Sequence, residues 1–296
     1  PATGSAILNA DDEDILNMKT KTRAQVVTCG FLKGVDVRAT NIDEFFSFEG
    51  GRGMIRENFG INFKLNYGGS FVPVKMRGVL GGAQVRAALS AAGVGLVLGI
   101  NLVQIAEALS GYLPPLGRLS VLEGIKGSIL IDDTYNASPL SMKEALHVLM
   151  NLSARGGSPP VRQAGASGGK AKRKIAVLGD MLELGKHTLE AHESVGRLVG
   201  KSADILITVG MRAKAIAEGA ITSGMIKRSV YSFNKTGEAG RFLQGLLRAG
   251  DLVLIKASQG VRLERVTEEV MAHPEDAPKL LSRQTPVWKK RVGLYD

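Results

Sequence analysis

The sequence has little of several features that would mark particular classes of protein. Cysteine occurs once among 296 residues, as Cys29, so the chain cannot form an internal disulfide, which suits a reducing compartment such as the cytoplasm. No apolar run approaches the length of a membrane span, and no signal peptide is visible at the N-terminus. Aromatic residues make up only 5% of the chain, and no recognised DNA-binding motif occurs. We therefore expect a cytoplasmic protein without a membrane span or a nucleic-acid partner.

Basic residues, in contrast, are in excess. Lys and Arg number 38 against 28 Asp and Glu, a formal net charge of +10, and this balance favours anionic partners such as nucleotides. The segment from about residue 153 to 173 is rich in Gly, Ser and Pro, and we expect it to form a flexible surface insertion. The basic residues at its end are Lys170, Lys172, Arg173 and Lys174. They form either a solvated loop or a nucleic-acid patch, and their setting favours the loop.

The second half of the chain alternates short apolar runs with amphipathic segments. With 296 residues, of which 44% are hydrophobic, the chain has room for two globular domains. The predicted strands are 174–178, 205–209, 229–233 and 252–255, and the predicted helices are 190–200, 212–222, 237–248 and 261–271. This alternation predicts an α/β domain with Rossmann-like topology.

The first half is less regular. Strands are predicted at 6–9, 25–29, 35–40, 62–65 and 71–76, the last two joined as a hairpin by Tyr67-Gly68-Gly69-Ser70, and helices at 11–18, 83–98 and 101–110. Pro114-Pro115-Leu116-Gly117 then breaks the pattern, as an interdomain connection does. We expect residues 1–112 to form one domain, which is incomplete because the strand at 6–9 already reads as an internal one. Residues 113–296 are expected to form the other.

The segment 128–149 reads as a strand, a polar loop and a helix. It begins β-rich, Ser138 suits a helix N-cap, Pro139 suits the first helical position, and apolar residues then recur at helical spacing. Open α/β sheets bind ligands at the carboxyl ends of their strands, and a helix N-terminus there favours phosphate. The polar residues predicted to be exposed to a nucleotide at this point are Asp132, Asp133, Tyr135 and Asn136. The alternative is a capped turn with solvated carboxylates.

Three ordered segments carry a family resemblance. The first is Asp-Asp-Thr-Tyr-Asn-Ala-Ser-Pro-Leu-Ser-Met from Asp132, and the second is Gly-Asp-Met-Leu-Glu-Leu-Gly from Gly179, with His-Glu-Ser-Val-Gly from His192 downstream. The third is Lys-Ala-Ser-Gln-Gly-Val-Arg-Leu-Glu from Lys256. Together they resemble the Mur ligases, in particular those members that add D-alanyl-D-alanine to a UDP-linked muramoyl tripeptide. The resemblance implies part of that family's central ATP-binding domain, followed by its Rossmann-like C-terminal domain.

The resemblance also implies an ATP-dependent enzyme of peptidoglycan synthesis. Such ligases phosphorylate the terminal carboxylate of UDP-N-acetylmuramoyl-tripeptide, and the amine of D-alanyl-D-alanine attacks the acyl phosphate to form an amide. ATP and Mg²⁺ are the implied cofactors, and a monomer is expected. By resemblance, Asp133 contacts the ribose, Arg118 reaches the nucleotide phosphates, and Tyr135 and Asn136 line the same crevice. Arg118 is alternatively a surface arginine at a domain hinge.

The other two segments are expected to carry the dipeptide side of the reaction. By resemblance, Asp180, Glu183, His192, Lys256 and Ser258 are the substrate-binding residues. An ammonium and a hydroxyl at the end of a strand can hold a carboxylate or a phosphate, although a lone histidine is more often a structural group. Because most of these residues fall just after parallel strands, we expect them to converge on one edge of the sheet.

The departures from the family pattern are equally informative. A Mur ligase carries a Gly-Lys-Thr/Ser phosphate loop at the start of its central domain, and this loop is absent here. The catalytic residues and metal ligands of the family would lie in the same missing portion, so we assign none. Ala83 and Ala257 stand where the family carries histidine and glycine. We expect a C-terminal fragment that is inactive alone; another Mur-type amino-acid ligase and a non-catalytic nucleotide- or dipeptide-binding protein are the alternatives.

Overall fold

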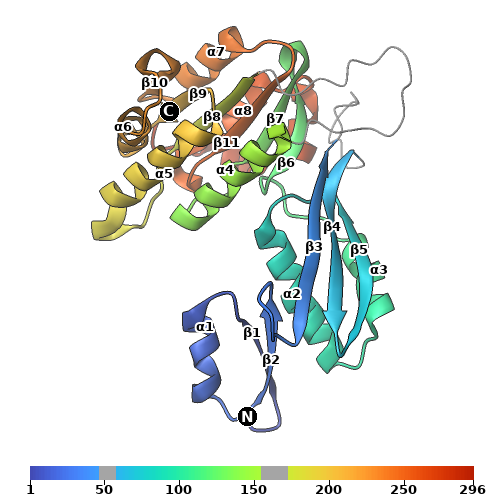
Figure 1. The fold of residues 1–296 in the computed structure, drawn as a ribbon. Coiled ribbons are helices and arrows are strands. Elements are labelled where there is room, and N and C mark those ends of the chain that lie inside the picture. The colour runs from blue at the N-terminus through green and yellow to red at the C-terminus, as the bar shows by residue number, and fades with distance from the viewer. Residues whose placement is uncertain (47–57, 155–172) are drawn as a thin grey trace. The chain divides into compact units, whose positions relative to one another are not determined.

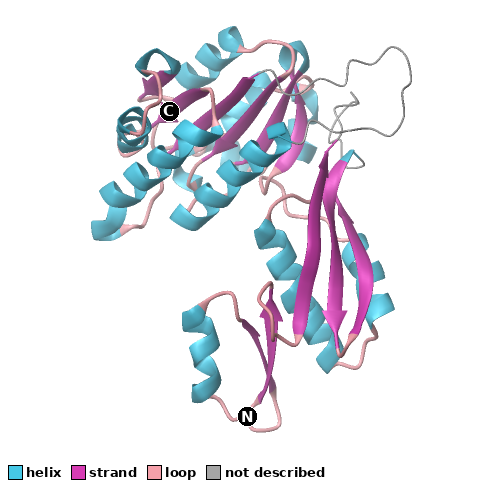
Figure 2. Ribbon diagram, in the orientation of Figure 1, coloured by secondary structure: helices cyan, strands magenta, loops and turns pink. Residues whose placement is uncertain are grey.

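The computed structural model describes residues 1–46, 58–154 and 173–296. They form two compact units, one reaching to Leu113 and the other running from Pro114 to Asp296, and each is built around its own β-sheet (Figures 1 and 2). Most of the expected insertion of about 153–173, with Lys170 and Lys172, lies outside the described residues. None of the described helices is long and apolar enough to cross a membrane.

The first unit contains a five-stranded sheet in the order β1-β2-β3-β4-β5. The strands are β1 (Ser5–Asn9), β2 (Gln25–Gly30), β3 (Val37–Phe46), β4 (Phe59–Tyr67) and β5 (Ser70–Arg77), and the helices are α1 (Glu13–Asn17), α2 (Gly82–Val97) and α3 (Leu102–Ser110). Gly68 and Gly69 form the predicted hairpin turn, with φ of +55° and +79°, which two glycines adopt at little cost. Helix α2 packs on β1 and β2, and α3 packs on β5, so the unit has its own apolar core.

The second unit contains a six-stranded sheet in the order β10-β9-β8-β11-β7-β6. Its strands are β6 (Ser120–Gly124), β7 (Ser128–Asp133), β8 (Arg173–Gly179), β9 (Ile205–Val209), β10 (Val230–Phe233) and β11 (Asp251–Lys256). All neighbouring pairs are parallel except β6 with β7. Helices cover both faces of the sheet: α4 (Pro139–Ala154), α5 (Thr188–Ser202), α6 (Lys214–Thr222), α7 (Thr236–Leu246) and α8 (Glu264–Val270). The predicted Rossmann-like α/β fold is confirmed.

The direction in which the strands are added decides which face each helix covers. From β7 through β8 and β9 to β10 the chain moves one way across the sheet, and it then returns to β11. Because β-α-β crossovers are right-handed, α4, α5 and α6 share one face and α7 lies on the other. The contacts agree, since α5 packs between α4 and α6 while α7 packs on α8. Loops leaving the carboxyl ends of β8 and β11 therefore lead to opposite faces.

The remaining elements are short. The 3-10 helices span Met18–Lys21, Ile125–Gly127, Gly185–His187, Lys227–Ser229, Gln259–Val261 and Pro274–Asp276, and the last α-helices are α9 (Ala277–Leu280) and α10 (Pro286–Lys290). The residues that follow α10 return to the second unit. The Leu294 amide donates to the Gly260 carbonyl at 2.9 Å, and the Thr236 amide donates to the Tyr295 carbonyl at 2.8 Å. The last turns of the chain are thus part of this unit.

Candidate functional site

The carboxyl ends of β8, β11 and β7 lie side by side. Strand β11 is the middle one, and Lys256 at its end pairs with Leu178 of β8 and with Asp133 of β7. Since the loops after β8 and β11 diverge to opposite faces, a crevice opens between them, and this is where open α/β sheets bind ligands. The three segments that resemble the Mur ligases begin at these three strand ends.

Ser258 ties the three loops together. Its Oγ accepts a hydrogen bond from the Leu182 amide at 2.9 Å and donates one to the Ala137 carbonyl at 3.3 Å. Its own amide donates to the Asp180 carbonyl at 3.0 Å. The predicted convergence of the segments after β8 and β11 on one edge of the sheet is therefore observed, and the loop after β7 joins them.

A cavity of about 700 Å³ lies at this edge. Asn136, Glu183 and Ser258 line it, one from each of the three segments. Trp288, Arg291 and Val292 also line it, and they come from the C-terminal segment, residues 281–296. Polar groups of both signs therefore face a volume large enough for a small molecule or a short peptide.

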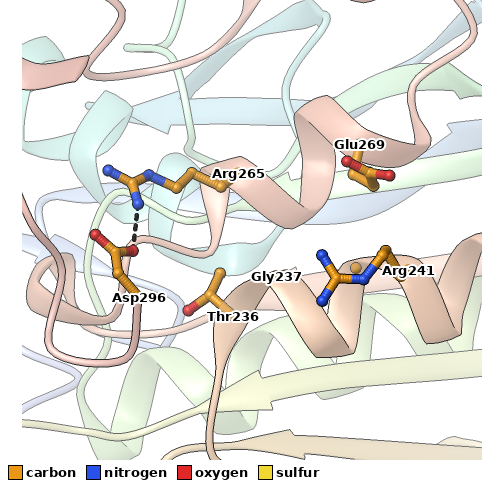
Figure 3. Close-up of a pocket in the computed structure, with 7 residues that line it drawn as sticks. Thr236, Gly237, Arg241, Arg265, Glu269 and Asp296 are labelled. Carbon is orange, nitrogen blue, oxygen red and sulfur yellow. Dashed lines mark hydrogen bonds and ion pairs between the residues drawn. The ribbon is translucent and has the colours of Figure 1, made fainter. Parts of the chain in front are cut away.

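A smaller cavity, of about 240 Å³, lies elsewhere in the unit, beside the N-terminus of α7 (Figure 3). Thr236, Gly237 and Arg241 of that helix line it, and Arg265 forms an ion pair with Asp296 at its edge. None of the predicted site residues line this cavity. The candidate site is therefore the larger cavity.

The expectation that Asp132 and Asp133 are exposed is wrong. Strand β7 runs through both residues, and both are buried. Asp133 Oδ2 lies 2.6 Å from Lys256 Nζ, with the two side chains 8% and 1% exposed. Lys256 also donates to the Asn136 carbonyl at 2.8 Å. Inside the domain, an ion pair with an extra hydrogen bond satisfies both charges. Asp133 and Lys256 therefore fix each other, and Lys256 also fixes the loop after β7 through the Asn136 carbonyl.

Asp132 is the more unusual carboxylate. It is fully buried, and its Oδ1 accepts a hydrogen bond from the Thr267 hydroxyl of α8 at 3.0 Å. Burial raises the pKa of Asp132 from 3.8 to about 7, against the opposing effect of the Thr134 and Thr267 hydroxyls, while the charges of Asp133 and Glu264 raise it further. Asp132 therefore belongs to the interior of the domain and does not face a ligand.

Tyr135 and Asn136 are exposed, as predicted. The Tyr135 ring is flanked by Arg118, whose guanidinium carbon lies 4.6 Å from the ring centroid, a distance typical of a cation-π contact. Within residues 1–46, 58–154 and 173–296, no carboxylate forms an ion pair with Arg118. An uncompensated guanidinium beside an exposed ring is suited to an anionic ligand with a planar group.

Asp180 and His192 are buried and make structural contacts. Asp180 accepts hydrogen bonds from the Ala213 amide at 2.7 Å and from the Tyr295 hydroxyl at 2.5 Å. His192 Nε2 accepts from the Met181 amide at 3.0 Å, and Nδ1 lies 2.6 Å from the Thr188 carbonyl, so Nδ1 carries the proton. Burial lowers the pKa of His192. Both side chains therefore support the loop after β8 through buried hydrogen bonds.

Glu183 of the same loop is exposed. Its backbone lies in the left-handed region, with φ of +64°, and its side chain lines the cavity. A non-glycine residue in this region carries a conformational cost and often marks a functional position. Of the five predicted substrate residues, the structure places Glu183 and Ser258 at the cavity and buries Asp180, His192 and Lys256 behind it.

The departures from the family pattern have simple structural settings. Ala257 is buried and has no positive φ, so alanine is not strained there. Gly200-Lys201-Ser202 is a Gly-Lys-Ser triplet, but it ends α5, where a helix exposes carbonyls and not amides, so it cannot cradle a phosphate. Ala83 lies in the first turn of α2.

The sequence patterns missed the contribution of the C-terminal segment. Trp288 contacts both Arg262 and Arg291, whose guanidinium carbons are 5.6 and 4.4 Å from its ring centroid. Arg262 is buried and pairs with Glu264, whereas Arg291 is exposed. The one feature of the sequence that could have indicated this contribution is the cluster of Trp, Lys and Arg at residues 288–291. Only the fold shows that it lines the cavity.

Comparison with known proteins supports the assignment of the candidate site to this edge of the sheet. The family model for the glutamate ligase domain of Mur ligases matches residues 161–259, which include the loop after β8 and the start of the loop after β11. With its Rossmann-like unit and these loops, the chain belongs to the Mur ligase family.

Two curated relatives within that family carry the same protein name. The UDP-N-acetylmuramoyl-tripeptide--D-alanyl-D-alanine ligases of Mycobacterium leprae and Mycobacterium tuberculosis are 37% identical over 190 residues and 32% identical over 290 residues. These matches cover 63% and 92% of the chain but 36% and 52% of the relatives. The chain thus spans about half or less of the length of these curated relatives.

Solved structures show the same likeness. MurF from Acinetobacter baumannii matches with a TM-score of 0.69 and 27% identity, over 89% of this chain and 51% of that one. MurF ligase from Thermotoga maritima in complex with ADP matches with a TM-score of 0.68 over 90% of this chain and 53% of that one. At 23% identity, the second match supports the fold alone.

Proposed function

We propose that this chain serves an ATP-dependent ligase that joins D-alanyl-D-alanine to UDP-N-acetylmuramoyl-tripeptide. The observation that supports it best is the meeting of three segments at one cavity, where Asn136, Glu183 and Ser258 face a common volume. The names of the relatives support the same reaction. In it, ATP phosphorylates the terminal carboxylate of the tripeptide, and the dipeptide amine displaces phosphate from the acyl phosphate.

On the nucleotide side, we assign direct contact to Arg118, Tyr135 and Asn136. No carboxylate among the described residues pairs with Arg118, so its guanidinium can meet phosphate oxygens, and the Tyr135 ring is exposed beside it. Asp133 has a different role from the expected ribose contact, because its carboxylate is used by Lys256. ATP fits this set of donors, and it supplies the phosphoryl group of the reaction.

Mg²⁺ has no comparable support. The described residues contain no group of three or more His, Cys, Asp or Glu side chains that could hold a metal. The Mg²⁺ that the resemblance implies is therefore not assigned to any of these residues.

On the dipeptide side, the cavity offers a carboxylate and a cation. Glu183 lines one wall, and Arg291 lies on the wall formed by the C-terminal segment. Among the described residues no carboxylate pairs with Arg291. A zwitterionic dipeptide carries an ammonium and a carboxylate, so one side chain suits each end. Asp180, His192 and Lys256 hold the loops that present these groups.

A monomer in the cytoplasm agrees with this role, as the sequence also predicts. Because the chain lacks a phosphate loop of the Gly-Lys-Thr/Ser type at the expected place, it should not turn over ATP when assayed alone.

Binding and activity test the proposal separately. Calorimetry on residues 1–296 should show binding of ADP in preference to GDP and of D-alanyl-D-alanine in preference to L-alanyl-L-alanine. A chimera that carries residues 1–296 in place of the matching half of the Thermotoga ligase should release phosphate only when ATP, the UDP-linked tripeptide and D-alanyl-D-alanine are all present. Binding of neither ligand by the folded chain would refute the proposed site, and a chimera that prefers a single amino acid would favour another Mur-type ligase.

A further inference from the structure

A buried arginine near the end of the chain holds the loop that carries Tyr135 and Asn136. The Arg283 side chain is only 4% exposed. Its Nη1 donates to the Thr134 carbonyl at 3.1 Å, and its Nη2 donates to the Tyr135 carbonyl. Two adjacent carbonyls are thus bound by one planar guanidinium, which fixes the direction of the peptide between them.

Arg283 is itself anchored by a buried carboxylate. Glu264, in the first turn of α8, accepts from Arg283 Nη1 at 3.1 Å through Oε2 and from Arg262 Nε through Oε1. Glu264 is fully buried, and an uncompensated charge there would be costly. The pairing therefore fixes Arg283 in place, and Arg283 in turn fixes the loop.

The opposite side of the loop is also held closely. The Tyr135 amide donates to the Gly117 carbonyl at 3.1 Å. Gly117 has φ of +74°, and a Cβ there would lie 3.1 Å from the Tyr135 nitrogen and 3.3 Å from Ser282 Oγ. Gly117 thus lies close to both Tyr135 and Ser282, and there is little space for a side chain at Gly117.

The two arginines around Tyr135 have different surroundings. Arg118 and Arg283 lie 4.6 and 5.6 Å from the ring centroid. Arg283 is occupied by Glu264 and two carbonyls, whereas Arg118 has no carboxylate partner in the described part of the chain. One guanidinium is thus available to a ligand and the other is used to hold the protein.

We propose that Arg283 is a positioning residue for nucleotide binding: it holds the Thr134-Tyr135 backbone so that Tyr135 and Asn136 are presented to the nucleotide beside Arg118. The proposal rests on the proposed function, because it takes this surface to be the nucleotide side. It adds to that function a residue from the C-terminal segment, which lies outside the three motif segments.

Arg283→Lys is the decisive variant. Lysine keeps the positive charge beside Glu264, but a single ammonium cannot serve the carboxylate and both carbonyls with the same geometry. Hydrogen-deuterium exchange should rise in the peptide covering residues 133–137. The Kd for ADP, measured by calorimetry, should rise about tenfold, as expected for the loss of roughly one well-formed contact.

Arg173→Lys is the matched control. Arg173 is half-buried, and like Arg283 it binds a carboxylate, Asp251, at 2.6 and 2.9 Å and a backbone carbonyl, that of Leu246, at 2.9 Å. It begins β8, at the end of the strand away from the loop. Arg173→Lys should lower the melting temperature about as much as Arg283→Lys does. It should leave hydrogen-deuterium exchange at residues 133–137 and the affinity for ADP unchanged.

Gly117→Ala tests the same loop if Arg283→Lys folds poorly. The added methyl group presses on the Tyr135 nitrogen while Arg283 stays intact, so exchange and the Kd for ADP should again rise together. Unchanged loop exchange in Arg283→Lys, or faster exchange with unchanged ADP affinity, would overturn the proposal. If the wild-type chain binds no ADP while loop exchange still rises in Arg283→Lys, Arg283 is purely structural and the nucleotide site fails as well.

Discussion

Lys256 and Asp133 form a buried ion pair between the ends of neighbouring parallel strands, with Nζ 2.6 Å from Oδ2. The same ammonium donates to the Asn136 carbonyl at 2.8 Å. One interaction therefore links the candidate nucleotide loop to the strand whose continuation lines the cavity. A change at either residue is expected to act through the loop and through stability, even though both residues resemble ligand contacts of the family.

Breaking this pair from one side should destabilise the fold strongly. Lys256→Met leaves Asp133 buried without a partner, and we expect a loss of roughly 3 to 5 kcal/mol in the free energy of unfolding. The double variant Lys256→Met, Asp133→Leu should recover part of that loss, because neither charge is then left buried. Urea unfolding of four chains, the wild type, the two single variants Lys256→Met and Asp133→Leu, and the double variant, measures this difference. A double variant that loses the sum of the two single losses would show that the pair is not coupled.

The sequence predicted the elements where the determining pattern is local. The hairpin at Gly68-Gly69, the cap at Ser138 and the alternation of strands and helices depend on residues close together in the chain, and all are present. The convergence of the loops after β8 and β11 was also predictable, because parallel strands bring their carboxyl ends to one edge.

Burial at the site was not predictable in the same way. Asp132, Asp133 and Lys256 have the composition of an exposed polar loop, and only pairing between segments far apart in the chain places them inside. Arg283 and Trp288 likewise belong to a segment with no strong periodicity. Their roles depend on where the chain returns to the sheet, and a single sequence does not reveal that.

Glu183 offers a test of conformation against function. Left-handed backbone costs a non-glycine residue about 1 kcal/mol, so Glu183→Gly should leave the free energy of unfolding unchanged or slightly higher. It should nevertheless weaken D-alanyl-D-alanine binding about tenfold, because a charge-assisted contact is lost. Lys126→Gly, at φ of +57° and away from the cavity, should affect stability similarly without affecting calorimetric binding. Wild-type dipeptide affinity in Glu183→Gly would remove Glu183 from the site.

Asp132 should lower the free energy of unfolding as the pH rises. Burial raises its pKa to about 7 in the folded chain from an ordinary 3.8, so between these values the folded state holds a proton that the unfolded state has lost. Stability from this group is complete below about pH 4 and declines through about pH 7, by up to about 1.4 kcal/mol per unit. Asp132→Asn removes the effect. The difference in unfolding free energy between the two chains should therefore change across this window, and parallel pH profiles would contradict the argument.

His192 should act in the opposite direction. Burial lowers its pKa below 6.5 in the folded chain, and its Nε2 must stay unprotonated to accept from the Met181 amide. Stability is therefore complete above about pH 6.5 and is lost as the pH falls toward the lowered pKa. His192→Gln keeps an acceptor for that amide and does not titrate. Thermal unfolding between pH 7.5 and 5 should show the wild type losing more stability than the variant, and an equal loss in both chains would show that folding does not lower the pKa of His192.

Gly196, within the segment that begins at His192, should be intolerant of a side chain for reasons of packing. A Cβ at Gly196 of α5 would lie 2.2 Å from the Ile216 carbonyl oxygen of α6, and a Cβ at Gly219 of α6 would lie 2.4 Å from the Glu193 carbonyl oxygen. Both contacts are with backbone, which cannot move aside as a flexible side chain would, so Gly196→Ala must push the two helices apart. We expect a loss of about 1 to 3 kcal/mol or more in the free energy of unfolding. Gly245→Ala, in α7, provides the control, because nothing lies within 4 Å of its added Cβ and alanine gains about 0.5 to 1 kcal/mol in an open helix. Urea unfolding of both variants decides the matter: a stabilised Gly196→Ala would mean that the α5 and α6 interface is looser than the structure describes.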